Sequence, residues 1–393
     1  MQLQSNSSHR LSAALQTVAK NINAKNALAI LANVLLTQRQ DGKFFFTASN
    51  NASQITIPAP LVVVEGKFTE PVALPVTNLV SYLSTLPDCV VNLTFQDGNI
   101  CVDYSYQEGK NDKSGKFSIP YEKADEFPIL RGIEGDNRVI ELPTSLFLEA
   151  IGQAKYFAGN DDLRIVLNSL CLDVAKDFSD VKLVSTDGHR LISYTHTNNP
   201  KTGGSDFYRK GDAGASMLPS SYFSVLSAFS GSETIRIEND ATTIVITADD
   251  IEFIGKAIEG RYPNYESVIP KNCPYHICVS KKEILSVIKR VSICASAATN
   301  MIILKKEGMF LTISAQDIDF ARSARDQVFI TDSECPDDFR IGFNAQMLSC
   351  AVNAINGDVV RMNLTSASHP CVITADSPNP TIRTLNMPLL IQE

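Results

Sequence analysis

The sequence contains no tryptophan and only five histidines among its 393 residues, and its nine cysteines are scattered. No two cysteines have Cys-x-x-Cys spacing, and their odd number argues against a disulfide framework and favours reduced thiols in a cytoplasmic protein. No histidine has the spacing of a helical metal site, and there is no P-loop or Gly-x-Ser-x-Gly motif. The sequence therefore gives little support to catalysis, and we expect no metal and no cofactor.

Long hydrophobic runs are also missing. No stretch approaches 18 uninterrupted apolar residues, the length of a membrane-spanning helix, and the first ten residues lack the apolar core of a secretory signal. With 44% hydrophobic and 20% charged residues, the composition is that of a soluble globular protein without a membrane partner. The net charge of −8 argues weakly against a nucleic-acid binder, although a locally basic surface is compatible with a net acidic chain.

A capped amphipathic helix recurs along the chain. Three segments begin with Leu-Pro, continue to a Ser or Thr cap and then carry apolar residues at helical spacing. Three more helical segments lie between and beyond them. The six predicted helices start at Leu11, Leu74, Leu142, Leu218, Ser280 and Asn344. Because these starts lie about 60 to 76 residues apart, the chain is about six copies of one unit.

Between the predicted helices, apolar and polar residues alternate on both sides of short turns. The clearest example is 90–106, with an Asp-Gly turn at its centre, and 234–250 and 301–317 repeat the scheme. Two such units pack their helices on one face of antiparallel sheets, which predicts an α+β fold with three similar domains at 1–134, 135–272 and 273–393. Chance recurrence in an ordinary multidomain protein is the alternative.

The segment 183–197, LVSTDGHRLISYTHT, stands out from this pattern. A catalytic loop or a metal site would use Asp187 and His189, but either needs a second base, a nucleophile or further ligands nearby. A plain hairpin turn, in which Asp-Gly supplies positive φ, is the structural alternative. The residues by themselves leave these alternatives open.

Two segments resemble the β sliding clamp of bacterial DNA polymerase III: STDGHRLISY at 185–194 and EGRYPNYESVIPK at 259–271. Shorter matches follow in the family's order at 27–36, 162–170, 341–348 and 386–390. The resemblance implies three similar DNA-clamp domains per chain, each with two helices on antiparallel sheets. It also implies a homodimer that closes head to tail into a ring around double-stranded DNA, without sequence preference and without enzymatic activity.

The resemblance further implies a peptide-binding pocket for DNA polymerase, the clamp loader and other proteins with a Gln-x-x-Leu-Phe-like clamp motif. The matching positions combine an apolar cleft with a polar frame. They are Leu167, Thr186, Gly188, His189, Arg190, Leu191, Pro263, Val268, Leu385 and Met387. For each aliphatic residue alone, packing in the core is the alternative.

A thin basic lining is expected on the helices. In the helix from Ser280, the apolar stripe of Ile284, Ile288 and Val291 leaves basic residues on the opposite face. The candidate DNA contacts are Lys20, Lys25, Lys155, Lys282, Lys289 and Arg290. Lys25 matches a position where the family carries a DNA-contacting Arg, and for each of the six an ordinary solvated helix surface is the alternative.

The chain departs from the family pattern at several positions. Asp161 and Ser267 replace neutral or basic residues, and an Asp161 carboxylate that faced DNA would repel phosphate. Leu390 replaces a terminal Arg, and 196–216 is longer than the family's connection and reads as a mobile polar loop. Two alternative functions therefore remain: a clamp-derived scaffold that binds peptides without encircling DNA, and a hydrolase that uses Asp187 and His189.

Overall fold

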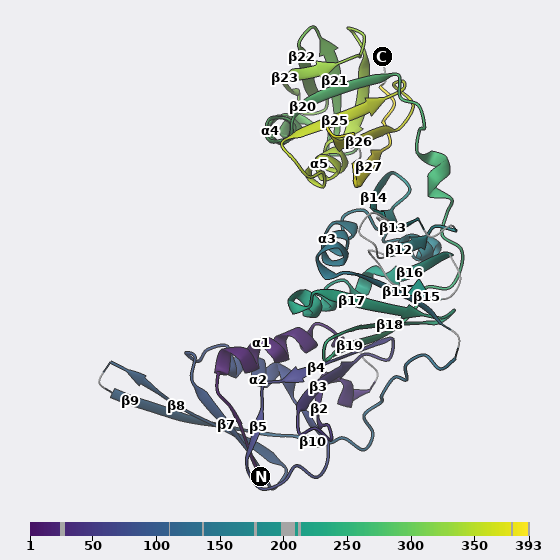
Figure 1. The fold of residues 1–393 in the computed structure, drawn as a ribbon. Coiled ribbons are helices and arrows are strands. Elements are labelled where there is room, and N and C mark those ends of the chain that lie inside the picture. Colours follow the sequence, from purple (N-terminus) through teal and green to yellow (C-terminus); the bar gives the residue numbers. More distant parts are fainter. Residues whose placement is uncertain are drawn as a thin grey trace. The chain divides into compact units, whose positions relative to one another are not determined.

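The computed structural model describes residues 1–23, 28–109, 111–135, 137–176, 179–197, 209–210, 214–378 and 380–391 (Figure 1). The chain folds as two compact units, and each is described here by itself. The first unit comprises Met1–Leu148, Phe207–Asp212 and Ser221–Ala257, and the second comprises Glu149–Asp206, Ala213–Ser220 and Ile258–Glu393. In the described part of the chain, no helix has both the length and the apolar character needed to cross a membrane.

The first unit contains two antiparallel sheets. The smaller has the strand order β5-β1-β7-β8-β9 and the larger has the order β10-β6-β2-β3-β4-β19-β18-β17-β11-β15. Strands of the smaller sheet are β1 (Gln2–Ser5), β5 (Val62–Glu65), β7 (Val90–Gln96), β8 (Asn99–Glu108) and β9 (Asn111–Pro120). Those of the larger are β2 (Val34–Gln38), β3 (Phe44–Ser49), β4 (Ser53–Ala59), β6 (Val72–Leu74), β10 (Glu122–Lys123), β11 (Arg138–Pro143), β15 (Arg209–Lys210), β17 (Thr234–Asn239), β18 (Thr243–Ala248) and β19 (Ile251–Lys256).

The predicted hairpin at 90–106 is confirmed. β7 and β8 pair from Val90 to Gln96, and the connecting Asp97 and Gly98 have φ of 51° and 77°. Positive φ at both central residues gives a two-residue turn the twist that neighbouring strands need. The Asp-Gly pair therefore sets the register of this hairpin.

Two helices of the first unit begin in different ways. The Ser7 side chain accepts a hydrogen bond from the Arg10 N–H at the start of α1 (Ser8–Ala19). No side chain caps α2 (Val76–Leu83), which begins directly after Pro75, so the side-chain cap predicted for this helix is wrong. The helix predicted from Leu218 is different, because the structure has two 3₁₀ segments there, η4 (Ser220–Tyr222) and η5 (Val225–Gly231). Serine recurs through 220–230, and its hydroxyl competes with helical hydrogen bonding.

The second unit is built on one antiparallel sheet of twelve strands, in the order β16-β12-β13-β14-β27-β26-β25-β20-β23-β22-β21-β24. These are β12 (Ser169–Val174), β13 (Asp180–Thr186), β14 (Arg190–Thr197), β16 (Gly214–Pro219), β20 (Tyr275–Ser280), β21 (Met301–Glu307), β22 (Phe310–Asp317), β23 (Arg322–Ser333), β24 (Arg340–Asn344), β25 (Val359–Leu364), β26 (Cys371–Ala375) and β27 (Ile382–Asn386). β14 pairs directly with β27, which brings the predicted turn next to the end of the chain.

Three α-helices complete the predicted set. The helix α3 (Thr144–Ala154) crosses the boundary between the units, while α4 (Lys281–Val291) and α5 (Ala345–Asn353) lie in the second unit. Ile284, Ile288 and Val291 are all buried, so the predicted apolar stripe of α4 is confirmed. The second unit also has the 3₁₀ segments η2 (Asp162–Leu167), η6 (Tyr265–Val268) and η7 (Ser292–Cys294). Helices on antiparallel sheets confirm the α+β class.

The predicted mobile loop at 196–216 is described only in part. Its first two residues belong to β14, residues 209–210 form β15, and its last three begin β16. The rest of the loop, 198–208 and 211–213, lies outside the described residues, as do two of the last three residues of the chain.

Candidate peptide-binding pocket and DNA-facing residues

The turn between β13 and β14 is held by its own side chains. The Asp187 Oδ1 atom accepts the backbone N–H groups of His189 and Arg190 at 2.8 and 2.9 Å, and Oδ2 accepts from the Arg190 Nε at 3.0 Å. The Thr186 hydroxyl donates to the Arg190 carbonyl at 2.7 Å and accepts from the Gly188 N–H at 3.1 Å. Gly188 has φ of 90°, which glycine adopts without strain. Both oxygens of Asp187 are therefore committed to building the turn.

This geometry favours the structural interpretation of the turn over the catalytic one. The His189 side chain is exposed, and the described residues supply it with neither a carboxylate nor a nucleophile within hydrogen-bond distance. Its backbone carbonyl accepts the Met387 N–H at 2.8 Å, which ties the turn to the end of β27. The turn can present His189 to a ligand, but it contains no base and nucleophile in contact.

A neighbouring loop adds a residue that the sequence did not single out. A Cβ atom on Gly188 would lie 3.1 Å from Arg164 Nη1, so the glycine leaves room for the Arg164 guanidinium beside the turn. Arg164 also pairs with Asp161 at 3.0 Å. Asp161 in turn caps η2 by accepting the Leu163 N–H at 2.9 Å. These contacts hold the pKa of the Asp161 carboxyl below its usual value, with the backbone bond as the larger cause.

The Asp161 carboxylate therefore has local partners, and repulsion of DNA phosphate by this residue stays a prediction. The carboxylate interacts with the N-terminus of η2 and with the Arg164 guanidinium, both within three residues of Asp161. A capping role of this kind is one of the commonest tasks of Asp in proteins.

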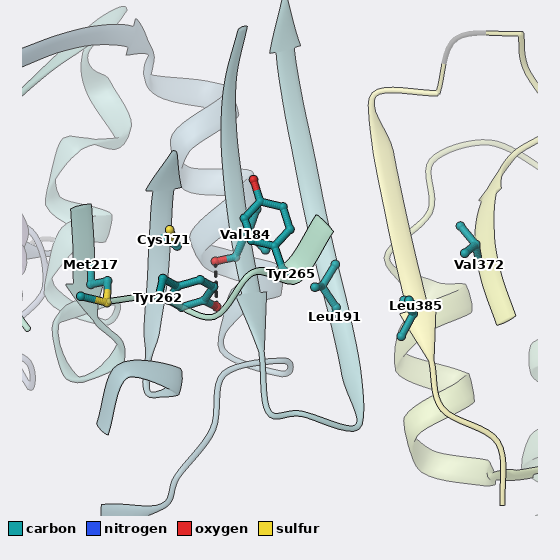
Figure 2. Packing of buried hydrophobic residues seen from close by; sticks show 8 residues of the cluster. All are labelled: Cys171, Val184, Leu191, Met217, Tyr262, Tyr265, Val372 and Leu385. Atoms are coloured by element: carbon teal, nitrogen blue, oxygen red, sulfur yellow. Dashed lines mark hydrogen bonds between the residues drawn. The ribbon is translucent and has the colours of Figure 1, made fainter. Parts of the chain in front are cut away.

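The floor of the candidate pocket is a buried apolar cluster (Figure 2). Leu191 on β14 and Leu385 on β27 face each other as direct cross-strand partners and are 2% and 4% exposed. Leu167 is buried as well. The full cluster is Cys171, Val184, Leu191, Met217, Tyr262, Tyr265, Val372 and Leu385. Leu191 and Leu385 thus belong to this buried cluster, and Leu167 is buried outside it.

Three of the predicted pocket residues are exposed and apolar, and we take them as the candidate rim. Val268 and Met387 are 51% and 38% exposed, and Pro263 is exposed too. Two tyrosines beside Pro263 anchor this segment: the Tyr265 hydroxyl donates to Asp173 Oδ2 at 2.7 Å, and Tyr262 lies buried in the cluster with its hydroxyl 3.5 Å from the Val184 carbonyl. Burial, together with Asp173, raises the pKa of the Tyr265 hydroxyl.

These two tyrosines belong to the buried cluster of the candidate site, and sequence reasoning did not single them out. They hold the chain between them so that Pro263 projects outward. The signal was present in the Tyr-Pro-Asn-Tyr stretch, where aromatic residues flank a proline, but no local pattern says that both rings are buried.

The basic candidates differ in their surroundings. The Lys20 ammonium, just after α1, donates to the Ser227 hydroxyl at 2.9 Å, and the Lys155 ammonium lies 4.7 Å from the centre of the Tyr156 ring. Both lysines are exposed at helix ends. Lys25 lies outside the described residues.

Only part of the α4 basic face is free to bind a phosphate. Lys282 and Lys289 are exposed and form no ion pair with any described residue. Arg290 instead pairs with Asp326 on β23, with nitrogen to oxygen distances of 2.6 and 2.8 Å. Much of the Arg290 charge is therefore balanced within the chain, which sequence periodicity could not reveal.

One group of side chains has metal-ligating atoms close together. Ligand atoms of His276, Cys278 and Asp332 lie within 4.8 Å of one another. The Arg361 guanidinium, however, is 3.9 Å from both the Cys278 sulfur and the Asp332 carboxylate, so a positive charge already stands at this position. The group is better described as a charge network, and the absence of a metal stays a prediction.

Comparison with known proteins covers nearly the whole chain. Family models of the DNA polymerase III beta subunit match its N-terminal domain at 3–131, its central domain at 141–264 and its C-terminal domain at 266–390. The beta sliding clamp of Synechococcus elongatus is 26% identical over 384 residues, covering 94% of both chains, and that of Bacillus subtilis is 23% identical over 376 residues, covering 93% of both.

Solved structures show the same fold. The beta subunit from Thermotoga maritima superimposes with a TM-score of 0.82 at 20% identity, and a sliding clamp from Pseudomonas aeruginosa bound to griselimycin superimposes with 0.83 at 20% identity. Both alignments cover 100% of each chain. Three family domains follow one another in the expected order along this sequence. The chain therefore belongs to the DNA polymerase III beta subunit family and has the general function of a sliding clamp.

Proposed function

We propose that two copies of this chain close head to tail into a ring around double-stranded DNA and tether DNA polymerase to it as a non-enzymatic processivity factor. The observation that carries this proposal is the match of three consecutive clamp domains to almost the full chain. In the ring, each chain contributes three domains with boundaries near residues 134 and 272.

Open sheet edges supply a means of closing the ring. Among the described strands, β9 pairs with β8 alone, and residues 322–327 of β23 pair only with β22. An edge strand presents unpaired N–H and C=O groups that can hydrogen-bond a strand of another chain. Because β9 belongs to the first unit and β23 to the second, pairing between them in two copies gives a head-to-tail dimer.

Enclosure suits a chain of this charge. Sequence-independent binding through Lys and Arg gives dissociation constants of about 10⁻⁴ to 10⁻⁶ M at physiological salt, which releases DNA quickly. A ring holds DNA by topology, so a chain with a net charge of −8 and few free lysines on its helices is sufficient. Lys20, Lys155, Lys282 and Lys289 are the described basic residues that we assign to this lining, and Lys25 is a further candidate.

The pocket is proposed to bind the clamp motif of polymerase, clamp loader and other partners. Pro263, Val268 and Met387 offer an exposed apolar rim over a buried apolar floor. His189 and the turn backbone add polar contacts. Burial of two anchors such as Leu and Phe contributes about 3 to 6 kcal/mol before ordering costs, which corresponds to about micromolar affinity once a few hydrogen bonds are added.

Two measurements test the proposal. Light scattering on the eluted protein should give about twice the 42.9 kDa chain mass at micromolar concentration. Protein loaded by a matching clamp loader should stay on nicked circular DNA and leave when that DNA is linearised. A strict monomer contradicts the ring, and peptide binding without retention on circles supports the scaffold alternative.

A further inference from the structure

A second, basic pocket lies on the sheet of the second unit. It has a volume of about 290 Å³ and is bounded by β25, β26 and β27 and by the segment 269–273. Arg361, Thr374 and Arg383 are direct cross-strand neighbours on these three strands, so they form a row on one face of the sheet. Strands lie about 4.8 Å apart, which places the two arginine Cα atoms about 10 Å from each other with Thr374 between them.

The cations of this pocket are not all balanced. Arg383 and Lys271 are exposed, and no acidic group among the described residues lies within ion-pair distance of either. Arg361 is different, because it pairs with Asp376 at 3.6 Å and with Asp332 at 3.9 Å and its charge is already balanced within the chain. The pocket therefore carries an excess of positive charge.

The floor between the arginines is polar and buried. Thr374 is 6% exposed, and its hydroxyl oxygen accepts a long hydrogen bond of 3.5 Å from the Asn363 amide. The hydroxyl donates to none of the described residues, so its hydrogen is available to a ligand oxygen. An oxyanion placed here would meet one O–H donor and the unpaired guanidinium of Arg383, beside the already paired Arg361. A guanidinium binds a planar carboxylate in a bidentate manner.

The basic pocket adjoins the floor of the peptide-binding site. Val372 belongs to the same apolar cluster as Leu191 and Leu385, and it also lines the basic pocket. Ile269, the residue after rim residue Val268, packs against that cluster and lines the basic pocket too. A peptide that crosses the rim at Val268 thus reaches the arginine row within a few residues.

We propose that this pocket binds a carboxylate side chain of the partner peptide, next to its apolar anchors, and so favours clamp motifs with an acidic flank. The inference rests on the proposed peptide-docking function. The preference for acidic flanks comes from the charge of Lys271 and Arg383, which no described acidic group balances. These residues lie around Thr374, in the row of cross-strand neighbours next to the row that forms the apolar floor.

The test compares peptides that differ only in the flanking charge. A fluorescent Gln-Ala-Ser-Leu-Phe core is extended by Glu-Glu or by Gln-Gln, at its amino end in one pair and at its carboxyl end in another. In one of the two pairs, the Glu-Glu peptide should bind about threefold to fivefold more tightly at low salt, as expected for a few partly exposed ion pairs. Raising the salt concentration should reduce this preference.

Variants locate the effect. The preference should vanish in the Lys271→Ala/Arg383→Ala protein and persist in Arg340→Ala, which removes an exposed strand arginine outside the pocket. The core peptide should bind all three proteins equally. Equal affinity of the Glu-Glu and Gln-Gln peptides in both pairs, or a preference that survives the double substitution, overturns the inference.

A second measurement does not depend on peptide docking. Protein labelled with ¹⁵N-arginine is titrated with N-acetylglutamate amide, and the Arg383 Nε–H signal should shift while that of Arg340 stays. If the core peptide fails to bind but this shift occurs, the proposed function fails and the carboxylate site stands. A shift with inorganic phosphate alone, or with neither probe, overturns the carboxylate site.

Discussion

Two halves of one sheet face in the second unit have opposite chemistry. A row of cross-strand neighbours runs from Leu191 through Leu385 and Val372 and then continues to Asn363 and His276. The first three are buried in an apolar cluster, whereas the last two belong to a polar network with Asp332 and Arg361. The same sheet thus supports an apolar floor at one end and a charge network at the other.

The difference between the halves comes from what covers them. Tyr262 and Tyr265 pack in the same buried cluster as the apolar half, with Tyr265 close to Leu191 (Figure 2). Past Ile269 the covering segment continues and lines the basic pocket with Pro270, Lys271 and Cys273. The two halves therefore differ in the residues that cover them, which change from buried tyrosines to an exposed lysine.

The largest expected effect comes from breaking the apolar half. Leu385→Ala should lower the free energy of unfolding by about 2 to 5 kcal/mol, since it leaves a cavity among buried side chains. Urea denaturation followed by circular dichroism measures this. Asn363→Ala on the polar half should lower the free energy of unfolding clearly less. If the two variants lose equal free energy of unfolding, the two halves of the sheet face do not differ in their contribution to stability.

A smaller loss is expected at the turn. Asp187→Ala leaves two backbone N–H groups and the Arg190 guanidinium without their acceptor, which should cost about 1 to 3 kcal/mol in unfolding experiments. Asp187→Asn keeps one oxygen for the two N–H groups and should lose less. If both variants are as stable as the parent protein, the side chain does not hold the turn.

The rim should affect binding rather than stability. Met387→Ala should weaken binding of a Leu-Phe peptide by about 1 to 3 kcal/mol and change stability by less than about 0.5 kcal/mol, because the side chain is partly exposed. Fluorescence anisotropy and thermal unfolding measure the two quantities. Ile318→Ala, which truncates an exposed side chain elsewhere, is the matched control and should leave affinity unchanged. Unaltered affinity in Met387→Ala removes this residue from the pocket.

The smallest effect is expected in the charge network. The hydrogen bond from His276, with further help from the charges of His276 and Arg361, holds the pKa of Asp332 below its usual value. A carboxyl with a lowered folded-state pKa stabilises the protein above the unfolded-state pKa of about 3.9 and loses this contribution as the pH falls through the folded-state value. Asp332→Asn should therefore lower the unfolding temperature at pH 6 but not at the acidic end of the titration.

The control for this pH effect is Asp319→Asn, an exposed carboxylate that pairs with no described residue. Its unfolding temperature should follow the parent protein at every pH. The unfolding temperatures of Asp332→Asn and the parent protein are compared from pH 6 down to acidic pH. If they differ by the same amount throughout, the network contributes no proton-linked stability.

Local patterns predicted the elements that depend on local forces. The Asp-Gly turns, the capped helices and the buried stripe of α4 follow from residues within one or two turns of one another. The same reasoning failed for the segment after Leu218, where repeated serines favour 3₁₀ geometry over the predicted α-helix. Lys25 and most of 196–216 lie outside the described residues, so expectations for them stay predictions.

The sequence by itself determined the α+β class and the residues that make up the turn, because periodicity, capping and turn chemistry act over short distances along the chain. Only the tertiary structure decided that Leu191 and Leu385 are buried, that Val268 and Met387 are exposed, and that Arg290 pairs with Asp326. Burial and ion pairing at these positions depend on strands that are far apart in sequence. The alternation of apolar and polar residues along one strand does not show which neighbouring segment will cover it.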